Sequence, residues 1–189
     1  MKLLLASKSP RRQQLLAELG YPIETISIDV DEHVSPTLPA SEVAEYLACR
    51  KSAACPLDIL TDDAVLVTAD TVVVLDGKVL GKPASPEEAR TMLHHLSGQK
   101  HQVYTGVCLR TLQRQLSFTE ETIVHFMPLS DQEIEYYIDH YRPFDKAGAY
   151  GIQEWIGMVG ISAIEGCYYN VMGLPVARLY HALKSIQGA

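Results

Sequence analysis

The chain has 189 residues, of which 47% are hydrophobic and 21% charged, values typical of a globular protein rather than a disordered one. This length suits one domain, spanning residues 1–189, with a substantial hydrophobic core. The net charge of −7 disfavours nucleic acid as a partner, because phosphate backbones attract basic surfaces. A site for phosphate in this chain must therefore be a local basic pocket.

The N-terminal sequence predicts neither a secretory signal nor a membrane span. Only a handful of apolar residues separate Met1-Lys2 from Lys8, which is too few for either. The four cysteines form no Cys-x-x-Cys pair and have no metal-ligand spacing. We expect them to be reduced, in a cytoplasmic protein.

The predicted elements follow a mixed α/β order. Strands are predicted at about 2–6, 23–28, 64–75, 78–80, 101–112 and 115–127. Helices are predicted at about 10–19 and 39–54, after Ser85, after Ser130, and from Pro175 to about Ser185. Consecutive hairpins flanked by helices favour α+β or mixed-sheet α/β over a doubly wound parallel sheet. The chain also lacks the glycine loops of dinucleotide-binding folds and of P-loop enzymes.

A Ser-Lys-Ser turn separates the first predicted strand from the first helix. Ser9 is a suitable N-cap, and Pro10 suits the first helical position. Arg11 and Arg12 follow, although the first turn of a helix normally favours acidic residues. Basic side chains, free amides and serine hydroxyls together predict a receptor for a strongly anionic group such as phosphate.

Asp70 interrupts a strand that is otherwise apolar and predicted to be buried on both faces. An unpaired carboxylate there would cost several kcal/mol, so we expect it to be paired, bound to metal or exposed at a cleft. A structural salt bridge is the simpler interpretation. We favour a functional carboxylate, because cleft carboxylates often act as bases.

Two lysines are candidate partners for this strand. If Asp76-Gly77 is a two-residue turn, Val74 pairs with Val79 and Thr71 pairs with Lys82. Taken alone, Lys82 is better interpreted as a surface lysine before a proline. Lys51 lies near the apolar stripe of the second helix, where it either extends to solvent or reaches into a cleft. The periodicity does not decide between these alternatives.

Two further segments carry polar residues. The acidic residues Asp29, Asp31 and Glu32 suit Mg²⁺ together with substrate phosphates, or form a solvated loop. The segment 145–153 is rich in small residues, and its Tyr150 and Gln153 suit a planar ring, although the pattern alone favours a plain loop.

The chain resembles the Maf family of nucleotide pyrophosphatases along nearly its whole length. The resemblance rests on the order and spacing of Ala6–Arg12, Asp29–Glu32, Lys51, Ala69–Thr71, Gly81–Pro83, Leu96–Gly98 with His101, Thr105–Val107, Asp145–Gln153 and Asn170–Pro175. It implies a two-lobed α/β structure with a central mixed twisted sheet and a deep cleft, similar to inosine triphosphate pyrophosphatases. The implied reaction is metal-assisted hydrolysis of a nucleoside triphosphate to a monophosphate and pyrophosphate.

The same resemblance implies roles for individual residues. Asp70 is expected to be the general base, and Glu32 with Asp70 to hold Mg²⁺ or Mn²⁺. The phosphate ligands are expected to be Ser7, Arg11, Lys51 and Lys82. The base-reading residues are expected to be Arg12, Thr71 and Gln153.

These specificity residues resemble those of the family branch that acts on dTTP and UTP, and the family implies a homodimer. Two alternatives remain open. One is the sister branch that prefers 7-methyl-GTP. The other is a non-catalytic nucleotide sensor or cell-division regulator.

Overall fold

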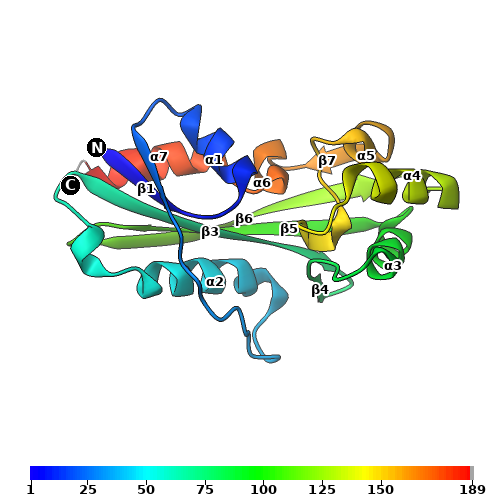
Figure 1. Cartoon of the computed structure of the whole chain (residues 1–189), viewed down its shortest axis with the longest axis horizontal. Helices are drawn as coiled ribbons and strands as arrows, with labels where there is room; N and C mark the ends of the chain where they lie inside the picture. The colour runs from blue at the N-terminus through cyan, green and yellow to red at the C-terminus, as the bar shows by residue number, and fades with distance from the viewer. Residues whose placement is uncertain (188–189) are drawn as a thin grey trace. The chain divides into compact units, whose positions relative to one another are not determined.

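The computed structural model describes residues 1–187 (Figure 1). Its strands are β1 (Lys2–Ala6), β2 (Ile23–Ile26), β3 (Ala64–Leu75), β4 (Lys78–Leu80), β5 (Lys100–Arg110), β6 (Gln115–Phe126) and β7 (Ile161–Glu165). Its α-helices are α1 (Pro10–Ala17), α2 (Ala40–Ala54), α3 (Pro86–Leu96), α4 (Asp131–Tyr141), α5 (Trp155–Val159), α6 (Tyr168–Met172) and α7 (Val176–Gln187). Two 3₁₀ turns are η1 (Leu57–Ile59) and η2 (Ala147–Ala149).

The strands form one mixed sheet in the order β2-β1-β3-β5-β6-β7, and β4 pairs with β3 outside this path. Strand β1 is parallel to both neighbours, with Leu3 opposite Ile23 and Val65. Strands β6 and β7 are antiparallel. The predicted mixed α/β class is therefore confirmed. The parallel pairing of β1 agrees with its buried Leu3–Leu5 run, since parallel strands that are covered on both faces are apolar throughout.

The chain divides into two compact units. Unit 1 comprises Met1–Asp70, Thr105–Glu120 and the chain from Gly173, and unit 2 comprises Thr71–Tyr104 and Glu121–Met172. In unit 1, helices α1 and α7 lie on one side of β1 and β3 and α2 lies on the other (Figure 1). Helix α2 packs so closely at Gly106 that an added Cβ would lie 2.2 Å from the Glu45 nitrogen. Only glycine fits this contact.

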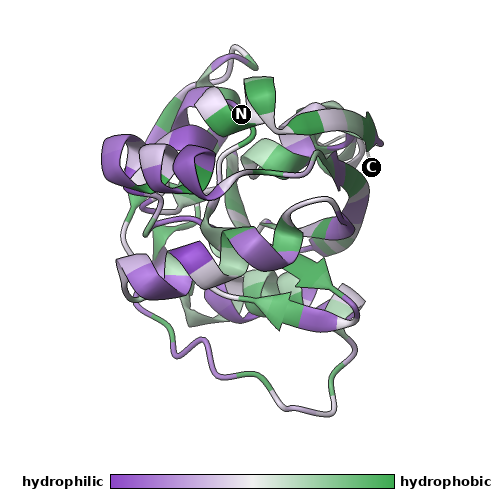
Figure 2. Ribbon diagram, turned by 90° about the vertical axis from the view of Figure 1, so that its right-hand side faces the viewer, coloured by the Kyte–Doolittle hydropathy of each residue, from purple (hydrophilic) through white to green (hydrophobic). Residues whose placement is uncertain are grey.

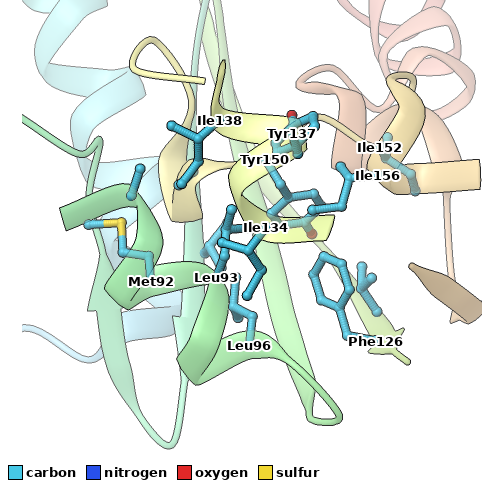
Figure 3. Close-up of a cluster of buried hydrophobic side chains, with 14 of the residues drawn as sticks. Met92, Leu93, Leu96, Phe126, Ile134, Tyr137, Ile138, Tyr150, Ile152 and Ile156 are labelled. Atoms are coloured by element: carbon cyan, nitrogen blue, oxygen red, sulfur yellow. The ribbon is translucent and has the colours of Figure 1, made fainter. Parts of the chain in front are cut away.

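Unit 2 has its own hydrophobic core beneath α3 and α4 (Figure 3). The side chains predicted to face inward on α3 are buried, namely Ala89, Met92, Leu93 and Leu96. Both helices begin as predicted, because the hydroxyls of Ser85 and Ser130 accept hydrogen bonds from the amides of Glu88 and Glu133. Hydrophilic and hydrophobic residues alternate along the helices (Figure 2), as expected where one face packs on a core.

The sequence missed three short elements. Helices α5 and α6 and strand β7 have five residues each and lie in or just after the glycine-rich stretch 147–166. Segments this short span too few turns or alternations for a periodic pattern to appear. The Asp76-Gly77 turn is as predicted, with positive φ values of 50° and 75°.

Candidate functional site

The basic turn after β1 is held by its own serines. The Ser9 side chain caps α1 by accepting a hydrogen bond from the Arg12 amide, at 3.5 Å, and Pro10 occupies the first turn. The Ser9 amide in turn donates to the Ser7 hydroxyl at 3.1 Å. No acidic residue lies in the first turn of α1. The helix start therefore presents Arg11 and Arg12 together with a positive helix end, as the sequence predicts.

The guanidinium of Arg12 is anchored within unit 1. Its Nε donates a hydrogen bond to the Gly173 carbonyl at 2.8 Å. Burial lowers the pKa of Arg12, while the carboxylate of Asp70 opposes this shift and the charge of Arg11 adds to it. Arg12 therefore lies within the electrostatic field of Asp70.

Asp70 forms an ion pair with Lys51. The Lys51 ammonium donates a short hydrogen bond to Asp70 and lies 2.8 Å from a Glu32 carboxylate oxygen. Asp70 and Thr71 interrupt an otherwise buried strand, and the side chains of Lys51 and Asp70 are 18% and 15% exposed. Lys51 thus reaches inward, toward Asp70, rather than extending to solvent.

A buried hydroxyl fixes the position of α2 against β3. The Thr68 side chain is buried and donates a hydrogen bond to the Ala48 carbonyl at 2.7 Å. Thr68 and Asp70 share a face of the strand, since side chains alternate along it. Lys51 follows Ala48 by about one helical turn, so this single bond helps place the ammonium beside the carboxylate.

The acidic residues after β2 each face a cation. Glu32 faces Lys51, while Asp31 lies 4.0 Å from Arg50 and Asp29 binds Lys8 at 2.7 Å. The hydrogen bond from Lys8 lowers the pKa of the exposed Asp29. Only Glu32 shares its cation with Asp70, which distinguishes it from the other two.

The geometry of Glu32 and Asp70 suits a hard divalent cation. Both carboxylates already converge on one positive group, the Lys51 ammonium. Within residues 1–187 no cluster of three or more histidine, cysteine or acidic side chains could hold a metal ion. A metal here would therefore need phosphate oxygens and water to complete its coordination, which is the usual arrangement for Mg²⁺.

The predicted pairing of Thr71 with Lys82 is wrong. The hairpin pairs Val74 with Val79 as expected, but the ladder ends at Val73 and Leu80. Beyond it, the Gly81 carbonyl accepts a hydrogen bond from the Gly148 amide at 3.0 Å. Lys82 comes directly after Gly81 in the chain, and its side chain is exposed.

Gln153 has a buried oxygen with no hydrogen-bond partner among residues 1–187. It lies with Thr71 and Lys82 in unit 2, whereas the other six predicted site residues lie in unit 1. These six are Ser7, Arg11, Arg12, Glu32, Lys51 and Asp70.

The sequence missed a buried polar network in unit 2. The Tyr137 hydroxyl donates to Glu154, which also lies 3.0 Å from the Lys146 ammonium. The signal for it was present, because a tyrosine on a buried helix face needs a partner for its hydroxyl.

In the described part of the chain, every helix is too short or too polar to cross a membrane. Residues 2–186 match the family described as Maf-like protein. A protein of Phocaeicola vulgatus named dTTP/UTP pyrophosphatase is 52% identical over 98% of this chain and 96% of its own length. A protein of the same name from Carboxydothermus hydrogenoformans is 52% identical over 97% of this chain and 98% of its own.

Among solved structures, the Staphylococcus aureus Ham1 protein covers 67% of this chain and 72% of its own, at 16% identity and a TM-score of 0.45. The family match and the relatives extend over nearly the whole chain, including all nine predicted site residues. The chain therefore belongs to the Maf-like protein family.

Proposed function

We propose that this protein hydrolyses dTTP and UTP to the nucleoside monophosphate and pyrophosphate. The observation that carries the chemistry is the joint pairing of Asp70 and Glu32 with Lys51, whose carboxylates also act electrostatically on Arg12 at the start of α1. The relatives named dTTP/UTP pyrophosphatase, at about 50% identity over nearly the whole chain, support the choice of substrate.

In this proposal Asp70 is the general base. It takes a proton from a water molecule whose oxygen then bonds to the α-phosphorus. The bond from the α-phosphorus to the bridging oxygen breaks, and pyrophosphate leaves with the electron pair. The proton stays on Asp70 until it is released to solvent.

Glu32 and Asp70 would hold the divalent metal, Mg²⁺ or Mn²⁺. Such an ion lowers the pKa of water and neutralises phosphate charge when it is bound. Their shared attraction for the Lys51 ammonium supports this assignment. The same carboxylates cannot hold Lys51 and the metal equally well, so we propose that Lys51 transfers to a phosphate oxygen when substrate and metal bind.

The remaining phosphate ligands in the proposal are Ser7, Arg11 and Lys82, which would offset charge that develops on the pyrophosphate leaving group. Gln153 would read the base, together with Arg12 and Thr71. The buried, unpartnered oxygen of Gln153 supports this role, since a buried acceptor without a donor is costly and rare.

Purified protein with Mg²⁺ tests the proposal. With dTTP or UTP it should release one pyrophosphate per monophosphate formed. Stepwise release of orthophosphate would point to a different class of hydrolase, and faster turnover of 7-methyl-GTP would favour the sister branch. Binding without turnover during prolonged incubation would indicate a nucleotide sensor.

The family resemblance also leads us to propose a cytoplasmic homodimer that consists of one domain per chain. Light scattering of the purified protein measures the oligomeric state directly, and a monomer at micromolar concentration would exclude the dimer.

A further inference from the structure

The carboxamide of Gln153 lies in a segment whose backbone is held in an unusual shape. Gly148 and Ala149, four to five residues earlier, both have positive φ values, of 67° and 60°. The left-handed conformation costs a residue with a Cβ about 1 kcal/mol, so surrounding contacts must maintain it at Ala149. Ala149 is fully buried. The segment is therefore fixed by its packing rather than by its own preferences.

A polar network joins both ends of this segment. The Lys146 ammonium lies 3.0 Å from Glu154 and 2.8 Å from Asp145. The Tyr137 hydroxyl donates to Glu154 and accepts a hydrogen bond from the Gly151 amide at 3.0 Å. One hydroxyl on α4 thus ties down two points of the segment, on either side of Gln153.

The network lies at the edge of the unit 2 core. Tyr137 is fully buried and Lys146 is 8% exposed, and Tyr137 projects among the apolar side chains of the core (Figure 3). Gly151 leaves room for the ion pair, because a Cβ there would lie 3.0 Å from the Glu154 carboxyl carbon and 3.1 Å from Lys146 Cε. The backbone and the buried charges therefore fit together as one arrangement.

Stability alone does not explain a buried ion pair at this place. The loss of hydration largely cancels the attraction between buried charges, and apolar residues of similar volume often stabilise as well. What such a pair can contribute is a defined conformation. Gln153 directly precedes Glu154, and its buried oxygen has no donor among residues 1–187. The rigid network therefore surrounds a side chain that is ready to accept a hydrogen bond.

We propose that Tyr137, Lys146 and Glu154 are positioning residues that hold the Gln153 oxygen where it accepts the N3–H of uracil or thymine. This inference rests on the proposed function and extends it. Uracil and thymine present an N–H donor at N3, whereas the cytosine ring presents an acceptor there. A carboxamide fixed in one orientation distinguishes the two, because mismatched bases leave buried polar groups unpaired. A mobile carboxamide would rotate, so that its oxygen accepts from the N3–H of uracil or its NH2 group donates to the N3 of cytosine, and it would not discriminate between the two bases.

The test compares the kcat/KM values for UTP and CTP in the whole protein. Tyr137→Phe removes only the hydroxyl that ties Gly151 to Glu154, and we expect the UTP/CTP ratio to fall at least tenfold. Tyr141→Phe is the matched control, since Tyr141 stacks on Tyr137 with ring centroids 5.2 Å apart but stands outside the network. Its ratio should equal that of the unmodified protein. Glu154→Gln provides the second variant if Tyr137→Phe does not fold.

If these residues had a purely structural role, their loss would lower kcat/KM for UTP and for CTP equally. An unchanged UTP/CTP ratio in Tyr137→Phe and Glu154→Gln therefore overturns the inference. Calorimetric binding of UMP and CMP separates this result from failure of the proposed function. If the protein hydrolyses neither triphosphate but prefers UMP, and Tyr137→Phe loses that preference, the positioning role stands and the catalytic one falls. An unmodified protein that binds UMP and CMP equally contradicts the positioning role.

Discussion

Lys51 binds Asp70 and at the same time lies 2.8 Å from Glu32, so one ammonium is shared by two carboxylates. Both carboxylates also act electrostatically on the guanidinium of Arg12. Lys51 is also the group that a metal ion must displace in order to bind both carboxylates. The ion pair therefore links three proposed roles, those of base, metal ligand and phosphate ligand.

Replacing Asp70 should remove catalysis and leave binding. In Asp70→Asn the amide oxygen can still accept a hydrogen bond from Lys51, but it cannot take a proton from water. We expect kcat for UTP to fall by about 10²- to 10⁴-fold, the usual contribution of a general base, while nucleotide binding stays measurable. Asp29→Asn, which loses only a surface pair with Lys8, is the control. Full activity in Asp70→Asn would remove this residue from the mechanism.

Replacing Lys51 should affect metal binding and turnover in opposite directions. Lys51→Met leaves Asp70 and Glu32 without their shared cation, so Mn²⁺ should bind more tightly in the absence of nucleotide, by about tenfold. Hydrolysis of UTP should nevertheless slow, because a phosphate ligand is lost.

Calorimetry with Mn²⁺ and a pyrophosphate-release assay measure the two effects separately. Lys8→Met removes an exposed ammonium from Asp29 and should change neither. Unchanged Mn²⁺ affinity in Lys51→Met would mean that Lys51 does not compete with metal.

The sequence predicted the framework of this site from local chemistry. Ser9 and Pro10 mark the start of α1, and the strand around Asp70 is bounded where its apolar run begins and ends. The need for a partner to Asp70 also followed from its buried surroundings. Such features depend on neighbouring residues, so periodicity and capping preferences reveal them.

The partners themselves could not be predicted, because they depend on packing between distant elements. From its place on the helix, Lys51 could extend to solvent or reach into a cleft. The hydrogen bond from Thr68 of β3 to Ala48 of α2 positions the helix so that Lys51 reaches Asp70. Hairpin arithmetic placed Lys82 beside Thr71, but the ladder ends at Leu80, and the next carbonyl, that of Gly81, accepts a hydrogen bond from the Gly148 amide. Neither bond joins residues that are adjacent in sequence.

His101 should make the stability of the fold depend on pH. Its Nε2 shares a 2.7 Å hydrogen bond with the Tyr150 hydroxyl, and its ring stacks on Phe126. Burial, assisted by the charge of His125, lowers the pKa of His101 from 6.5 to about 4. Between these pH values the unfolded chain binds a proton that the folded protein does not. The free energy of unfolding is therefore highest above about pH 6.5 and decreases as the pH falls toward 4.

The full decrease due to this histidine is on the order of 3 kcal/mol. Urea unfolding at several pH values between 7.5 and 4 measures it. His101→Gln should reduce the pH dependence, although it lowers stability at neutral pH, whereas His95→Gln on the exposed face of α3 should leave the dependence as it is. If the free energy of unfolding changes with pH equally in His101→Gln and in the unmodified protein, His101 is not the source of the pH dependence.

Cys49 should be the first of the shifted thiols to react with iodoacetamide. A hydrogen bond from Cys108 lowers the pKa of Cys49 to about 7, and Ser117 contributes in the same direction. Burial raises the pKa of Cys55 to about 11, and the pKa of Cys108 is also raised, chiefly by the same thiol contact. The thiolate is the reactive form, so alkylation of Cys49 should accelerate about tenfold between pH 6 and pH 8.

Peptide mass spectrometry after timed alkylation identifies the modified residue. Cys49→Ser should abolish the fast, pH-dependent reaction, and Cys55→Ser should preserve it. Cys108→Ser replaces the thiol donor with a hydroxyl of different length, so the pH at which alkylation of Cys49 accelerates should shift. A fast reaction that persists in Cys49→Ser would place the reactive thiol elsewhere.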